Sequence, residues 1–215
     1  MRSSAYLLML AAAFTACKKD SDDECPAPMT GPASYPTASY APYAAGSWWV
    51  YTGVNIAPGT GVETPNSMRD SIFVEGDTII DGRSYAHLRG ERFGLFGVDQ
   101  WVGVDGPRLV EPNGNVLMDV TAVSDTIATG PGPFFPVDST ATVLKSQSLG
   151  LLTPAGIFVS DHARELVFYM QPGFTSPLFE ADNYVQDIGI AMYSSFYASS
   201  GVRIEMRLAD HHIEE

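Results

Sequence analysis

The chain has 215 residues, and with 12 Lys or Arg against 25 Asp or Glu its formal net charge is −13. This excess of acid argues against a nucleic-acid partner, because neutralising phosphates needs a basic surface, and it gives no electrostatic attraction to anionic lipid. The two cysteines, Cys17 and Cys25, both lie near the N-terminus, so neither a disulfide framework nor a thiol nucleophile is expected in the core.

The first sixteen residues have the pattern of a secretory signal peptide. Arg2 supplies a positive charge, and an uncharged apolar run follows at 5–16. The run is shorter than the about 20 residues that span a bilayer, so we expect a cleaved signal. Phe14-Thr15-Ala16 before Cys17 resembles the lipobox of bacterial lipoproteins, with Phe in place of the commoner Leu. The resemblance implies cleavage at 16/17 and an acyl anchor on Cys17; an ordinary signal with a chance cysteine is the alternative.

A charged block follows Cys17 and resembles the acidic export signal of surface-exposed lipoproteins of Bacteroidota. The resemblance implies an outer-membrane protein displayed on the cell surface, and a periplasm-facing protein is the alternative. A solvated tether would have the same composition, and a calcium loop would need a Gly and a spacing that are missing. The residues of this candidate export signal are Lys18, Lys19, Asp20, Asp22, Asp23 and Glu24.

Residues 17–44 are rich in Pro, Ala, Ser and Thr and have no hydrophobic period, which predicts an extended tether. From residue 45 the pattern changes to short apolar runs, long enough in total for one domain with its own core. In the first run, Trp48 and Trp49 point to opposite faces of a strand. One is expected in the core, and both are candidate partner contacts.

Later runs have the period of β-strands, and Asp81-Gly82 and Asn113-Gly114 predict tight hairpin turns between them. Only residues 161–169 have room for a turn or two of helix. The sequence predicts an all-β fold, either a curled antiparallel meander or open barrel, with a β-sandwich as the alternative. The runs are 48–51, 71–75, 78–80, 83–89, 108–111, 116–120, 141–144, 165–170, 188–193 and 202–208.

Several motifs within the domain resemble those of small β-rich lipoproteins of Bacteroidota. They are GSWWVY at 46–51, GDTIIDGRSY at 76–85, TPAGIF at 153–158, IGI at 188–190 and LADH at 208–211. His211 replaces the usual Tyr, and Asp187 stands where the family often has glycine. The motifs consist of aromatic and turn residues, so the resemblance implies a fold and carries over no catalytic residue.

The domain lacks the motifs of common catalytic sites: there is no G-x-S-x-G, H-E-x-x-H, P-loop or C-x-x-C. Asp161-His162 is a weak acid–base candidate, because neighbouring residues of a strand face apart. The last six residues, DHHIEE at 210–215, are of types that bind metal ions, but the end of a chain is usually poorly ordered and does not hold ligands in a fixed geometry. We therefore expect no metal, no cofactor and no enzyme activity.

Four acceptors follow an aspartate in a pattern that resembles the O-glycosylation motif of exported Bacteroidota proteins: Ser71, Thr78, Thr126 and Ser139. Asp before Ser or Thr is equally a good junction between turn and strand. Both interpretations are open.

Three functions fit these observations. The first is a non-catalytic envelope module that binds a protein or an extracellular polymer. The second is a carrier of an apolar ligand in a lipocalin-like cavity, with the GLFG and PFFP segments at 94–97 and 133–136 as flaps. The third is a hydrolase that uses carboxylates on the sheet, which a buried carboxylate with a raised pKa would favour.

Overall fold

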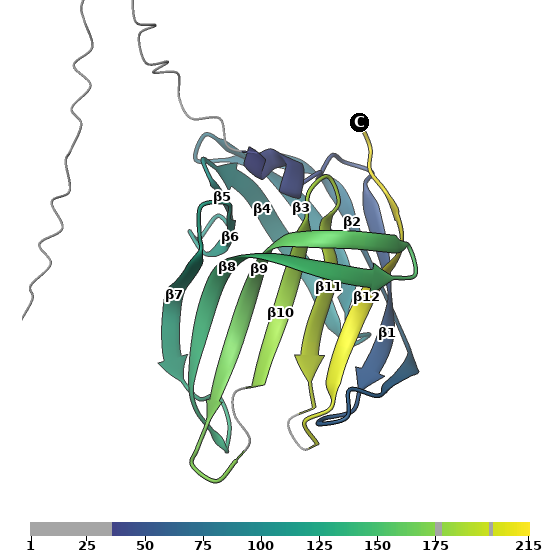
Figure 1. The fold of residues 1–215 in the computed structure, drawn as a ribbon. Helices are drawn as coiled ribbons and strands as arrows, with labels where there is room; N and C mark the ends of the chain where they lie inside the picture. Colours follow the sequence, from purple (N-terminus) through teal and green to yellow (C-terminus); the bar gives the residue numbers. More distant parts are fainter. Residues whose placement is uncertain (1–35, 175–177, 198–199) are drawn as a thin grey trace, which may run out of the picture. The chain divides into compact units, whose positions relative to one another are not determined.

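The computed structural model describes residues 36–174, 178–197 and 200–215 (Figure 1). Cys17, the candidate export signal at 18–24 and the tether up to residue 35 lie outside the described residues. Within the described part of the chain, no helix has the length and apolar character needed to cross a membrane.

The described residues form one twelve-stranded antiparallel sheet, preceded by a short 3-10 helix. The elements are η1 (Pro36–Tyr40), β1 (Trp48–Ile56), β2 (Glu63–Ile80), β3 (Arg83–Arg92), β4 (Phe96–Asp105), β5 (Arg108–Val110), β6 (Val116–Asp119), β7 (Ser124–Pro131), β8 (Val137–Thr153), β9 (Gly156–Met170), β10 (Leu178–Val185), β11 (Gly189–Phe196) and β12 (Arg203–His212).

The strand order is β6-β5-β4-β3-β2-β1-β12-β11-β10-β9-β8-β7. The first and last strands, β1 and β12, pair at the centre of the sheet. The two edges are β6 and β7, which are separated in the sequence only by residues 120–123. The chain therefore runs outward from β1 to one edge and returns from the other edge to β12. The sheet curls strongly into a half-barrel (Figure 1). The predicted curled antiparallel meander is confirmed, and the sandwich alternative is wrong because the strands belong to a single sheet.

Alternation along the strands separates an inner face, which holds the core, from an outer face. On β12, Ile204, Met206 and Leu208 are buried and join side chains of β1, β2 and β11 in the main apolar cluster. Arg203, Glu205 and Arg207 alternate with them and point to the outer face, as the alternation in the sequence predicts. Burying each of the large side chains stabilises the sheet by about 1.5–3 kcal/mol.

The predicted tight hairpin turn at Asp81-Gly82 is confirmed, whereas the one at Asn113-Gly114 is wrong: these residues lie in a longer loop, 111–115, in which Asn113 does not have a positive φ. Asp81 and Gly82 join β2 to β3 with φ values of 50° and 78°, the left-handed pair that a tight hairpin requires. Gly114, between β5 and β6, has φ 86°. The expectation of helical turns at 161–169 is wrong, because β9 runs through this segment and pairs with both β8 and β10.

Residues 36–44, which the composition assigns to the tether, pack onto the sheet. Tyr40 is buried, and its ring meets His162 edge-on at 5.1 Å. Tyr43 packs edge-on against Trp49 at 5.5 Å. The folded part of the chain therefore begins before residue 45.

The hairpin of β8 and β9 bends away from the sheet at an irregularity between Ser146 and Leu149. Its distal part, residues 147–160, is here named the strap. The strap crosses the outer face in front of β10 and β11 and reaches β12 (Figure 1). At its tip the Ala155 amide donates to the Leu208 carbonyl at 3.1 Å. Beneath the strap, Leu151 packs with Val185 and Ala191 in a second small core.

Candidate binding groove

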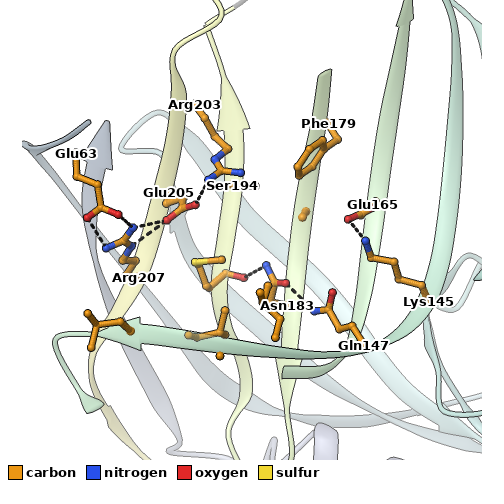
Figure 2. Close-up of a pocket in the computed structure, with 16 residues that line it drawn as sticks. Glu63, Lys145, Gln147, Glu165, Phe179, Asn183, Ser194, Arg203, Glu205 and Arg207 are labelled. Atoms are coloured by element: carbon orange, nitrogen blue, oxygen red, sulfur yellow. Dashed lines mark hydrogen bonds and ion pairs between the residues drawn. The ribbon is translucent and has the colours of Figure 1, made fainter. Parts of the chain in front are cut away.

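A groove of about 550 Å³ lies on the outer face of β8–β12, with the strap along one side. Its floor consists of side chains from adjacent strands, because every second residue of β10, β11 and β12 points outward. Asn183 and Ala181 come from β10, Met192 and Ser194 from β11, and alternate residues of β12 complete the floor. Figure 2 shows these residues, with charged groups at the two ends.

One end of the groove holds a chain of four charged side chains. The Arg207 guanidinium donates to both carboxylate oxygens of Glu63, at 2.9 and 2.6 Å, and also to Glu205 at 2.9 and 2.6 Å. Glu205 accepts in addition from Arg203 at 2.8 Å. The hydrogen bonds to Glu63 and then to Glu205 raise the pKa of Arg207, although burial acts in the opposite direction. The hydrogen bonds that Glu63 accepts from Arg207 lower the pKa of Glu63.

The other end holds the ion pair of Lys145 with Glu165. At the start of the strap, the Gln147 amide donates to Asn183 at 2.9 Å and to Ser160, at the other end of the strap, at 2.8 Å. Asn183 in turn donates to the Met192 carbonyl at 3.3 Å. These contacts hold two planar amides at fixed orientations on the groove wall.

Phe179 supplies an aromatic surface within the groove. Its side chain is 37% exposed, and the Arg203 guanidinium carbon lies 6.0 Å from its ring centroid. Figure 2 shows Phe179 between the two charged ends. An exposed ring face beside fixed hydrogen-bonding groups provides both an apolar platform and directional contacts.

The groove carboxylates, Glu63, Glu165 and Glu205, all accept hydrogen bonds from, or form ion pairs with, neighbouring cations. A general acid for glycoside hydrolysis needs a carboxyl group with a raised pKa, whereas the pKa of Glu63 is lowered by Arg207. Elsewhere on the molecule, Asp99 and Asp119 also have lowered pKa values.

The structure separates the two candidate contact tryptophans. Trp49 is 2% exposed, and its indole N–H donates to the Ile188 carbonyl at 2.7 Å. It is a core residue, and the expectation that it contacts a partner is wrong. Trp48 is half-buried and stacks on His212 at 6.2 Å, on the face opposite Trp49.

The four candidate glycosylation residues all lie within strands. Ser71 and Thr126 are exposed, whereas Thr78 and Ser139 are half-buried. Asp70, which precedes Ser71, is fully buried: it accepts from the amides of Phe93 and Gly94, at 2.5 and 2.7 Å, and from the Tyr193 hydroxyl. At this position the aspartate has a structural role, and glycosylation of the four residues stays a prediction.

Among the residues that the structure describes, no group of three His, Cys, Asp or Glu side chains is placed so that it could hold a metal ion. His212 pairs with Glu214 at 2.7 Å at the chain end. His87 stacks on Trp101 at 3.9 Å, between Glu75 and Asp99. His162 packs under η1, and burial lowers its pKa.

Sequence reasoning did not identify the groove. The polar residues of β12 can be recognised in the sequence from their alternation. Glu63 and Arg207, however, are 144 positions apart, and they meet only because β12 pairs with β1 and β1 pairs with β2. The sequence contains one local sign of the groove. Arg203, Glu205 and Arg207 share one face of β12, and alternating opposite charges on a strand face indicate an ordered charged surface.

No protein-family model matches the chain, and no curated protein matches it. One similar solved structure is that of a protein from Bacteroides fragilis described as exported and having a YmcC-like fold. It is 12% identical, with 80% of this chain and 97% of that chain covered and a TM-score of 0.44. Another is a protein from Parabacteroides distasonis described as a lipoprotein, with 10% identity, the same coverages and a TM-score of 0.36. Both similarities are too low to support an argument about activity.

Proposed function

We propose that this chain is a non-catalytic, lipid-anchored envelope protein whose outer groove binds an uncharged, hydroxyl-rich polymer, namely a neutral polysaccharide chain. In this proposal Cys17 carries the anchor and the folded domain faces the cell exterior. The observation that carries the proposal is the groove itself, in which a partly exposed phenylalanine stands among charged groups that are already paired with one another.

The charge balance of the groove favours an uncharged ligand. Its three carboxylates and three cations neutralise one another, although the whole chain carries a net charge of −13. A charged ligand would have to break one of these pairs, and leaving one partner unpaired is costly. Hydroxyl groups can instead donate to the carboxylates and accept from the guanidinium and amide groups without displacing them.

The apolar-carrier alternative has less support. The inside of the half-barrel is occupied by the main apolar cluster, and the space left near its centre, about 230 Å³, is lined by Arg92, Arg164, Asp182 and Glu111 among others. An apolar ligand would leave such groups without hydrogen-bond partners. Of the segment at 94–97, the first two residues belong to the turn between β3 and β4 and the last two begin β4; Leu95 is exposed.

The test is affinity electrophoresis of the full mature chain in gels that contain a neutral polysaccharide (dextran, starch or galactomannan) or a charged one (pectate or heparin). We expect a neutral polysaccharide to slow the protein. Phe179→Ala should weaken that binding by about tenfold, since an aromatic anchor typically contributes more than 1 kcal/mol. The matched control is Phe135→Ala, which removes another exposed phenylalanine, outside the groove.

Three results would contradict the proposal: retardation by the charged polymers alone, retardation by no polymer, or equal weakening by the two phenylalanine variants. The last result would indicate non-specific contact with exposed rings.

A further inference from the structure

The inside of the half-barrel contains a second polar site, separate from the outer groove. Two cavities of about 380 and 230 Å³ share Arg92, Arg164 and Asp182 in their walls. The larger one is the more open to solvent and is lined also by Phe96, Glu180 and Ser195 at the end of the sheet. The smaller one continues inward past Tyr43 and Tyr184. The shared residues place the two cavities next to each other on the inner face.

Arg92 already has an anionic partner in this shared wall. Its guanidinium pairs with Asp182 across the half-barrel and lies over the Tyr193 ring at 4.1 Å. Burial alone would lower the pKa of Arg92, but the Asp182 carboxylate more than offsets it and the pKa is raised. Asp182 is therefore committed to Arg92.

Arg164 has no such partner. It is half-buried and lies directly opposite Asp182 in the pairing of β9 with β10. Among the residues that the structure describes, none accepts a hydrogen bond from its guanidinium or forms an ion pair with it, and its Nε is fully buried. A guanidinium in this situation is unfavourable unless something else in the cavity pairs with it.

The other carboxylates of the two cavities are occupied. Glu111 accepts from Gln100 and Asn115, each at 2.8 Å, and Glu180 accepts from Ser195 at 2.6 Å. The cavity walls thus leave one cation unpaired while keeping anions nearby. A single negative charge fits this arrangement, whereas a multiply charged anion would be repelled.

Phenol groups add neutral donors beside Arg164. Tyr43 and Tyr184 line the inner cavity, and burial raises the pKa of both well above the ordinary value, so both keep their protons. The inner cavity, at about 230 Å³, has room for several water molecules or for a small organic anion. A planar, bidentate acceptor matches the fork of a guanidinium best.

We propose that this inner site binds a small organic monocarboxylate, whose carboxylate pairs with Arg164 and whose short apolar body lies toward Phe96. The site is independent of the polymer groove, which lies on the opposite face of the sheet.

The probes are sodium acetate, butyrate and benzoate, added to the full mature chain at constant ionic strength with sodium chloride as the reference salt. The measurement is the equilibrium constant for unfolding by urea. A carboxylate that binds only the folded protein lowers this constant by a factor of about eleven at ten times its Kd. We expect this decrease for the wild type and its loss in Arg164→Met, which removes the charge and keeps the length of the side chain.

Two further variants make the result specific. Arg89→Met removes an exposed outer-face arginine and should keep the full response to carboxylates. Phe179→Ala should also keep it, so that a failure of the groove proposal and a failure of this one are distinguishable. Equal responses of the wild type and Arg164→Met, or no response to any of the three carboxylates, would overturn the inference.

Discussion

Arginine side chains on the two faces of this sheet differ in what surrounds them. On the outer face Arg207 makes hydrogen bonds to two carboxylates, so its position is set before a ligand arrives. On the inner face Arg164 is close to a carboxylate that pairs with another arginine. Under our two proposals, the same residue type would serve a hydroxyl-rich ligand on one face and a carboxylate on the other.

His162 is the residue whose titration should affect stability most directly. It packs against Tyr40 and η1, where burial lowers its pKa below the ordinary value of 6.5 despite the nearby carboxylates of Asp161 and Asp119. The unfolded chain therefore takes up the proton first as the pH falls. The stability contributed by neutral His162 is complete above about pH 6.5 and is lost progressively below it.

We predict that urea unfolding between pH 7 and pH 5 will show this loss in the wild type and that His162→Gln will reduce it. The difference in slope is at most roughly 1.4 kcal/mol per pH unit. Parallel curves for the wild type and His162→Gln would show that another group is responsible.

The strap is the element that turns a sheet face into a groove. Its attachment depends on the small core of Leu151, Val185 and Ala191 and on the tip hydrogen bond from Ala155 to Leu208. The neighbouring Leu152 also borders the groove but is 70% exposed, whereas Leu151 is 2% exposed. Alternation along one short segment thus separates the attaching side of the strap from its free side.

We predict that Leu151→Ala will lower the free energy of unfolding by about 2 kcal/mol or more, as expected for a buried leucine, and will speed amide hydrogen exchange in the strap. It should also weaken binding in the groove, because Gln147 and the strap backbone form one wall. Leu152→Ala is the matched control and should change stability by no more than about 0.5 kcal/mol. Similar effects of the two changes would mean that the strap is not held by its inner side.

For the molecule as a whole, the sequence predicts the class of fold because alternation and turn chemistry are local. The Asp81-Gly82 hairpin and the two faces of β12 follow directly from neighbouring residues. The bend of the strap does not, since it depends on an irregularity near Ser146 whose register is set by β9. Strand pairing over long separations is what places Glu63 beside Arg207.

The candidate site was less predictable than the fold for the same reason. The sequence draws attention to tryptophans, histidines and D-[ST] pairs, yet Trp49 is in the core and Asp70 supports the turn that leads into β4. Ion pairs such as Lys145–Glu165 and Arg92–Asp182 have no signature before the strands are aligned. The candidate groove therefore depends mainly on the register of the sheet.

The central claim is that the outer groove is the binding surface for a neutral polymer. The most direct measurement is a two-dimensional NMR titration of the ¹⁵N-labelled protein with an oligosaccharide cut from the polysaccharide that retards it. We expect the signals that shift to come from the groove and the strap, including Phe179, Ser194 and Arg203, while those of the outer face around His87 and Trp101 stay in place. Shifts confined to the His87 region or to the inner cavity around Arg164 would contradict the account.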